Sequence, residues 1–128
     1  MGHYVMEANL YNGLCLAYIG DAIYEIYVRK HAMAMGLTKV KDLHQVVTSY
    51  TNASAQAKCI HTYLEQNLLS EDELAIFKRG RNSHIHTKRK NVDLASYLDS
   101  TGFEALLGYL YLSGRISRLE ELIEISLN

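Results

Sequence analysis

The stretch that decides the fold reads LAYIGDAIYE and covers residues 16–25. Apolar residues recur around it at helical spacing, so that one stripe of a helix carries Leu14, Tyr18, Asp21, Tyr24 and Val28. Asp21 is the exception on this stripe, because a buried carboxylate without a partner costs several kcal/mol. Such an acid either caps a neighbouring helix or pairs with a buried arginine, or it belongs to a functional site.

A second acid sits in an equally apolar setting, in the stretch TGFEALLGYLYL at residues 101–112. Glu104 shares a helical face with Leu107, Gly108 and Tyr111. A structural interpretation is available here too, because the segment from Thr101 to Glu104 fits a capping box at the start of a helix. Taken alone, each acid is better explained by a structural role.

The two acids together favour a functional site. Each lies in an apolar helix beside a glycine, and two such helices can pack face to face and bring Asp21 and Glu104 together. Two carboxylates with room for water suit Mg²⁺, which prefers oxygen ligands. Bound magnesium can activate water and stabilise the charge that develops on a phosphodiester during hydrolysis. The pair therefore predicts a magnesium site.

The remaining pattern is helical almost throughout. Gly36 is expected to stop the first helix, and Ser70 with Glu73 forms a capping box that opens another. A second capping box is expected at residues 117–120, before the last helix. We expect an all-α domain of about six or seven helices, with the other helices near residues 40–47, 53–64, 94–98, 103–112 and 119–127 and a loop or frayed helix end at 80–90.

Composition supports one globular domain spanning residues 1–128, because 48% of the residues are hydrophobic and 21% are charged. Residues 1–6 are expected to be partly a cloning remnant or disordered. The start lacks the features of a signal peptide, and the apolar runs are too short to span a membrane. Cys15 and Cys59 are expected to be reduced core thiols. These features predict a cytoplasmic protein.

Positive charge is concentrated in one segment of a chain whose net charge is −1. Residues 78–92 hold six basic residues and no acid, and such a segment can bind a polyanion through its local field. We choose Arg79, Arg81 and Lys90 as phosphate contacts, with Asn82 as a hydrogen-bonding neighbour. The competing interpretation is a solvated basic loop.

The motifs resemble those of a known family. The stretch at residues 16–25 resembles the signature helix of ribonuclease III domains, and that at 101–112 looks like the family's second acidic helix. The resemblance covers the chain from about Leu10 to the end. It is closest to the Mini-III branch, because KRGRN at residues 78–82 and ASAQA at 53–57 are similar to segments of that branch.

The resemblance implies a ribonuclease III-type fold and a magnesium-dependent endoribonuclease, with Mn²⁺ as a substitute. It implies that Asp21 and Glu104 bind the metal and carry the catalysis, and that double-stranded RNA is cut to leave 5′-phosphate ends. It further implies a homodimer that matures the precursor of 23S ribosomal RNA, with a ribosomal protein as a possible helper.

The sequence departs from the longer ribonuclease III enzymes at three positions. Those enzymes carry further acids at positions that are occupied here by Ala17, by Thr101, and by Ser54 or one of its neighbours. The chain also ends at Asn128, without room for their separate domain that binds double-stranded RNA. Two other functions therefore stay open: a catalytically inactive ribonuclease III-like domain that binds structured RNA, and a helical adaptor whose acids are only caps.

Overall fold

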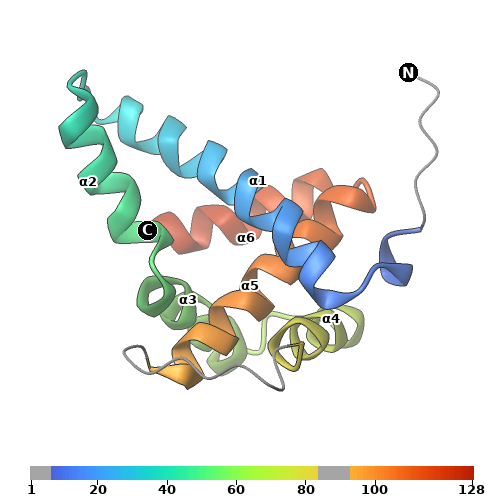
Figure 1. Cartoon of the computed structure of the whole chain (residues 1–128). Coiled ribbons are helices and arrows are strands. Elements are labelled where there is room, and N and C mark those ends of the chain that lie inside the picture. The colour runs from blue at the N-terminus through green and yellow to red at the C-terminus, as the bar shows by residue number, and fades with distance from the viewer. Residues whose placement is uncertain (1–6, 84–92) are drawn as a thin grey trace.

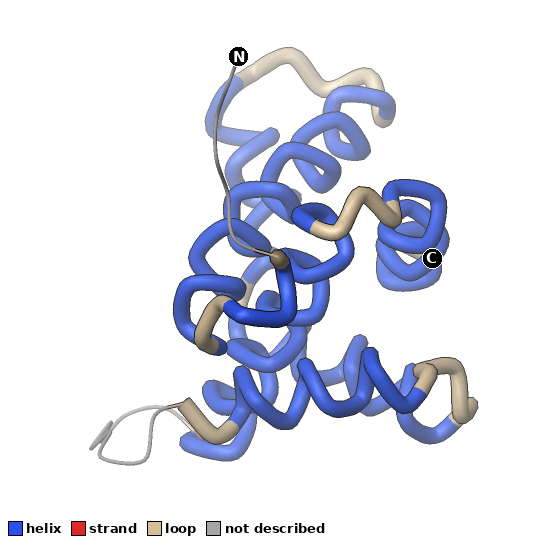
Figure 2. Tube along the Cα trace, turned by 90° about the vertical axis from the view of Figure 1, so that its right-hand side faces the viewer, coloured by secondary structure: helices blue, strands red, loops and turns tan. Residues whose placement is uncertain are grey.

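The computed structural model describes residues 7–83 and 93–128, and all its regular elements are helices (Figures 1 and 2). Within these ranges there is a short 3₁₀ helix and six α-helices, which confirms the predicted all-α class and the number of helices. In chain order they are η1 (Ala8–Leu10), α1 (Gly13–Ala34), α2 (Val40–Thr51), α3 (Ala53–Glu65), α4 (Glu71–Arg81), α5 (Leu94–Leu112) and α6 (Ile116–Leu127).

Helix α5 forms the centre of the molecule. Between Asp99 and Leu110, every residue is buried except Glu104. The most extensive contacts of α5 are with α1, which crosses it, and with α4 and α3, which pack near its start (Figure 1). A helix that is apolar on all sides must be covered by neighbours, and α5 is covered in this way. No helix in the described ranges is both long and apolar enough to cross a membrane.

Two glycines set the crossing of α1 and α5. A Cβ atom on Gly20 would overlap the backbone carbonyl of Glu104, and one on Gly108 would overlap the backbone carbonyl of Leu16. The two backbones therefore touch at positions where no larger residue fits. This confirms the expectation that the glycines allow the two acidic helices to approach each other closely.

Aromatic rings fill the space between α1, α3 and α5. The rings of Tyr24 and Phe103 meet edge to face with centroids 5.0 Å apart, a favourable arrangement for aromatic pairs. The hydroxyl of Tyr63 donates to the carbonyl of Leu122 at 2.5 Å, so the core also holds α6 in place. The aromatic core thus joins helices that lie far apart in the sequence.

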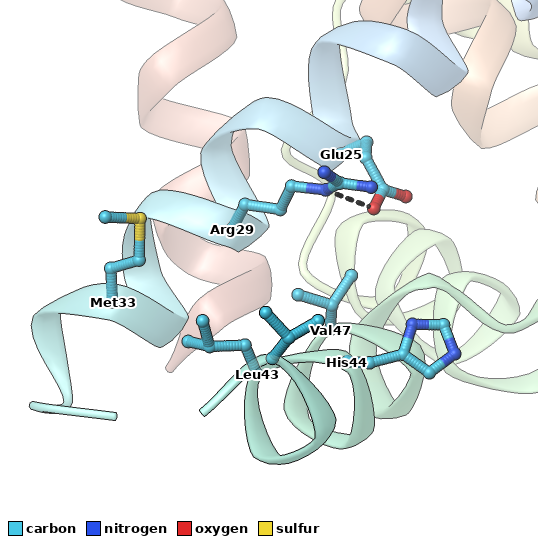
Figure 3. A pocket seen from close by; sticks show the side chains of 7 residues that line it. Glu25, Arg29, Met33, Leu43, His44 and Val47 are labelled. Atoms are coloured by element: carbon cyan, nitrogen blue, oxygen red, sulfur yellow. Dashed lines mark hydrogen bonds and ion pairs between the residues drawn. The ribbon is translucent and has the colours of Figure 1, made fainter. Parts of the chain in front are cut away.

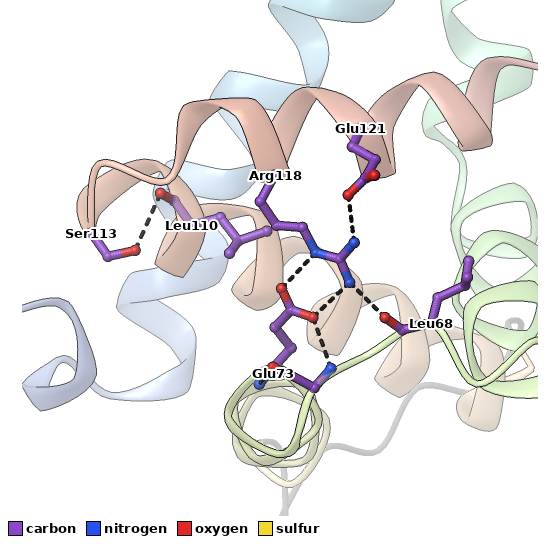
Figure 4. Close-up of polar contacts among 7 residues, drawn as sticks. Leu68, Glu73, Leu110, Ser113, Arg118 and Glu121 are labelled. Atoms are coloured by element: carbon purple, nitrogen blue, oxygen red, sulfur yellow. Dashed lines mark hydrogen bonds and ion pairs between the residues drawn. The ribbon is translucent and has the colours of Figure 1, made fainter.

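An ion pair between the buried Glu73 and the partly exposed Arg118 joins α6 to the start of α4 (Figure 4). Arg118 donates to both carboxylate oxygens of Glu73, each at 2.8 Å, and to the carbonyl of Leu68 at 2.6 Å. The same glutamate closes the predicted capping box with Ser70, which the structure confirms. The pKa of Glu73 is lowered, chiefly because Arg118 hydrogen-bonds to its carboxylate.

The prediction of two helices near residues 94–112 was wrong. Helix α5 runs unbroken from Leu94, with Asp93 as its N-cap accepting from the amide of Ala95 at 3.0 Å. Thr101 lies inside this helix, and its hydroxyl donates to the carbonyl of Tyr97 at 3.2 Å. The capping box proposed for Thr101 and Glu104 is therefore excluded. The small residues of this segment are needed for close packing, because a Cβ on Gly102 would lie 2.6 Å from the ring of Phe77.

The predicted second capping box was also wrong. Helix α6 begins at Ile116 with Arg115 as N-cap and no side-chain cap, so Ser117 lies inside the first turn. Gly36 does follow the end of α1, with a φ of +85° that favours glycine.

The buried stripe of α1 differs from the expected one. Leu16, Gly20, Tyr24 and Val28 face the core, whereas Leu14 and Tyr18 are 44% and 84% exposed. Asp21 is exposed too, so it lies at the edge of the buried face. Cys15 is exposed and Cys59 is half-buried, which corrects the expectation that both are core thiols. The apolar face of α1 is wider than one stripe, and part of it has no cover within the described chain.

Candidate active site

The crossing of α1 and α5 also brings the two predicted acids together. Asp21 follows Gly20, and the backbone of Glu104 is what Gly20 touches. The side chain of Asp21 lies close enough to that of Glu104 to raise the pKa of the Glu104 carboxyl group. A neighbouring carboxylate favours the protonated form of a buried acid, because two like charges repel each other.

Burial and the neighbouring acid raise the pKa of Glu104 to about 8. Loss of solvation is the largest cause, followed by the hydrogen bond and the negative charge of Asp21. A carboxyl group with such a pKa is protonated at neutral pH unless a cation takes the place of the proton. The pair is therefore suited to binding a cation.

Helix α3 adds a third residue to the site that the sequence did not reveal. Gln56 is buried, and its side-chain amide donates to a carboxylate oxygen of Glu104 at 3.5 Å. This contact lowers the pKa of Glu104, whereas burial and Asp21 raise it. A buried glutamine within an otherwise small and apolar helix face was the available signal, since buried amides need partners.

A further acid lies one helical turn beyond Asp21 but faces a different partner. Glu25 pairs with Arg29 at 2.8 Å. Both line a hollow of about 250 Å³ between α1 and α2, above Leu43 and Val47 (Figure 3). Glu25 is therefore neutralised by its own helix and is not part of the acid pair.

The positions where longer enzymes carry additional acids are occupied by small residues. Ala17 and Thr101 are buried, and Ser54 is exposed. Within residues 7–83 and 93–128, no group of three or more His, Cys, Asp or Glu side chains could hold a metal ion. Two carboxylates remain, which fits a cation that keeps several of its waters, as Mg²⁺ does.

The predicted phosphate contacts lie in different environments. Arg79 donates to the carbonyls of Asn9 and Tyr11 at 2.6 and 3.1 Å, so its guanidinium holds the segment before α1. Arg81 pairs with the buried Asp99 at 2.6 Å. Asn82 is exposed at the end of α4. Lys90 lies outside the described residues.

Comparisons with known proteins agree with this arrangement. Residues 14–115 match the family described as "Ribonuclease III domain". The chain is 48% identical over 119 residues to "Mini-ribonuclease 3" of Streptococcus pneumoniae, covering 93% of each chain. It is 50% identical over 112 residues to the Enterococcus faecalis protein of that name, covering 88% of this chain and 85% of the relative.

A solved structure shows the same fold. A crystal structure of a Fusobacterium nucleatum protein superposes with a TM-score of 0.83 at 28% identity, covering 96% of this chain and 97% of the other. The family match includes both acidic helices, and the relatives align over most of their own length. The chain therefore belongs to the ribonuclease III family, in its Mini-ribonuclease 3 branch.

Proposed function

We propose that this endoribonuclease hydrolyses phosphodiester bonds of double-stranded RNA with magnesium held by Asp21 and Glu104. The observation that carries the proposal is the packing of Gly20, the neighbour of Asp21, on the backbone of Glu104, together with the raised pKa of Glu104. Such a pair is costly to ionise unless a cation joins it. That cost argues against a merely structural role, because neither acid caps a helix here.

The chain's own residues prepare the site. Loss of the proton from Glu104 frees both carboxylates as ligands, and Gln56 holds the Glu104 carboxylate from the α3 side. The crossing at Gly20 fixes the two backbones, so the acids cannot drift apart. When bound, magnesium (or Mn²⁺) would supply an activated water and charge stabilisation at the phosphorus. Hydrolysis would leave 5′-phosphate and 3′-hydroxyl ends.

Double-stranded RNA as the substrate rests on the family and on the basic residues near the end of α4. Arg81 and Asn82 remain partly or fully exposed, and we assign them, with Lys90, to phosphate contacts. Arg79 donates to backbone carbonyls, so we assign its main role to holding the segment before α1. We expect binding that weakens steeply with salt, because phosphate contacts release counterions.

We also infer a homodimer. Tyr18 is 84% exposed and Leu14 is 44% exposed. Both line a hollow of about 420 Å³ next to Asn12, Cys15 and Ser83. A second copy would bury these apolar side chains against the same face, as a twofold interface does. Two copies would also present two acid pairs to one duplex.

The natural substrate is proposed from the relatives' branch. We infer that it is the precursor of 23S ribosomal RNA, processed in the cytoplasm, with a ribosomal protein as a possible helper. Ribosomal precursors contain long paired stems, which suit an enzyme that reads the shape of double-stranded RNA.

The test is direct cleavage by the purified protein. A labelled RNA duplex should be cut with Mg²⁺ or Mn²⁺ and left intact with a chelator, and the products should carry 5′-phosphates. A single strand of the same sequence should be cut far more slowly. Salt-sensitive binding of the duplex without cleavage would contradict the proposal and favour an inactive RNA-binding domain. If the protein neither binds nor cleaves the duplex, the result would favour a helical adaptor.

A further inference from the structure

A second polar cluster lies on the interface between α3 and α5, and the sequence patterns did not suggest it. Asp99 is buried, with a side chain only 9% exposed. It accepts from Nε of Arg81 at 2.6 Å and contacts Nε2 of His61 at 2.8 Å. One carboxylate thus holds side chains from α3 and α4.

The cluster leaves hydrogen-bond donors available to an anion. Arg81 balances the charge of Asp99. The side chains of His61 and Arg81 are 53% and 37% exposed. Among the described residues, Arg81 has no hydrogen-bond partner besides Asp99, so its terminal amino groups are open to a ligand. An imidazolium that donates from Nε2 to Asp99 would also donate from Nδ1.

The cluster is close to the acid pair. His61 lies five residues after Gln56 on α3, and Asp99 lies five residues before Glu104 on α5. Gln56 contacts Glu104, and His61 contacts Asp99. Both contacts therefore lie along the interface between α3 and α5, which run antiparallel to each other. Five residues correspond to about 7.5 Å of helix rise.

We propose that His61 and Arg81, held in position by Asp99, bind a backbone phosphate of the RNA close to the acid pair. Asp99 acts as a positioning residue, because it fixes the direction of both donors and is itself shielded from solvent. The guanidinium supplies paired N–H groups that match a phosphate, and the exposed His61 ring lies beside it on the same carboxylate. The inference rests on the proposed function and adds a specific phosphate site to it.

The experiment measures binding separately from cleavage. Dissociation constants for a labelled RNA duplex are determined across a salt series, with divalent cations removed by a chelator. His61→Gln should weaken binding about five-fold, because it removes the imidazole ring from the site and changes a side chain that is half exposed.

A second variant removes the ion pair without leaving a buried charge. In the double variant Arg81→Met with Asp99→Leu, apolar side chains replace both partners, a change that proteins often tolerate. Binding should weaken about ten-fold, and the slope of log K against log salt should fall by about one. Urea unfolding checks that the fold is retained.

The matched control is Lys30→Gln, the loss of an exposed cation nine residues from Asp21 on α1. Nine residues make two and a half turns, so Lys30 lies on the opposite side of α1 from Asp21. Its affinity and salt slope should equal those of the wild type. If the wild type binds and cleaves the duplex while His61→Gln and the double variant bind as tightly as Lys30→Gln, the phosphate site is refuted and the proposed function stands. A wild type that neither binds nor cleaves the duplex overturns both.

Discussion

Glu104 carries its proton at neutral pH because it is shielded from solvent and lies against a second acid. Its pKa of about 8 in the folded protein lies above the ordinary value of 4.5. Between these two values the folded state binds a proton that the unfolded state releases. The free energy of unfolding of the metal-free protein should therefore fall as pH rises from about 4.5 to about 8.

The variant Glu104→Gln tests this linkage, because an amide cannot titrate. Urea unfolding in the presence of a chelator, at several pH values across that window, should show a smaller fall for the variant than for the wild type. Glu65→Gln, which changes an exposed glutamate, should behave like the wild type. An equal pH dependence in all three proteins would contradict the assigned pKa.

The close approach of the helices that carry Asp21 and Glu104 could be predicted from the sequence, because each acid lies in an apolar helix that contains a glycine. The partners Gln56 and Asp99 could not be predicted in the same way. A polar residue in a helix has many possible partners, and only the packing of α3 and α4 on α5 selects one. Arg79 shows the same limit, because its basic character suggested RNA while its guanidinium binds backbone carbonyls.

The crossing of α1 over α5 depends on glycine at two positions. Gly20→Ala would force the two backbones apart, because its Cβ would overlap the carbonyl of Glu104. We expect a loss of about 3 kcal/mol in the free energy of unfolding, together with a loss of cleavage beyond what stability explains. Urea unfolding and cleavage assays check both.

The control is Ala22→Ser, which changes an exposed residue on the same helix. It should alter the free energy of unfolding by no more than about 0.5 kcal/mol. A similarly small effect of Gly20→Ala would contradict the proposed role of glycine in the crossing.

The attachment of α6 to α4 depends on Arg118. Arg118→Met would leave the buried carboxylate of Glu73 without its cation, and such a loss costs about 3–5 kcal/mol. Because the pKa of Glu73 is lowered in the folded state, the stabilisation is present at neutral pH and lost as pH falls through the folded pKa. The difference between variant and wild type in urea unfolding should therefore be large at pH 7 and small in acid.

The control for this pair is Glu121→Gln, which removes the exposed partner of the same guanidinium. It should cost at most about 1 kcal/mol, because exposed ion pairs contribute little. Equal costs for Arg118→Met and Glu121→Gln would show that the buried pair does not hold α6 in place.

Helix positions were largely predictable, but the continuity of α5 and the start of α6 were not. The capping box at Ser70 has a local cause, namely reciprocal hydrogen bonds within four residues. The continuity of α5 through Gly102 depends instead on packing against α4. Glycine and threonine in that stretch suggested a break, whereas tertiary contact required small side chains there.

Assembly of two copies should depend on the exposed apolar face of α1. Tyr18→Asp would place a charge in the proposed interface, and we expect a monomer in analytical ultracentrifugation at micromolar concentration where the wild type is a dimer. Val40→Asp, which changes a residue 79% exposed at the start of α2, should remain dimeric. A wild type that is monomeric at the same concentration, or a dimeric Tyr18→Asp, would contradict the proposed interface.

We propose above all that Asp21 and Glu104 act together as the metal-binding acids of the enzyme. The most direct measurement is the single-turnover cleavage rate of an RNA duplex at saturating Mg²⁺ for Asp21→Asn, Glu104→Gln and the control Glu25→Gln. The first two should each lose about a thousand-fold or more in rate while duplex binding persists. Glu25→Gln should stay within about ten-fold of the wild type, because Glu25 pairs with Arg29. Cleavage at the wild-type rate by either Asp21→Asn or Glu104→Gln would contradict the claim.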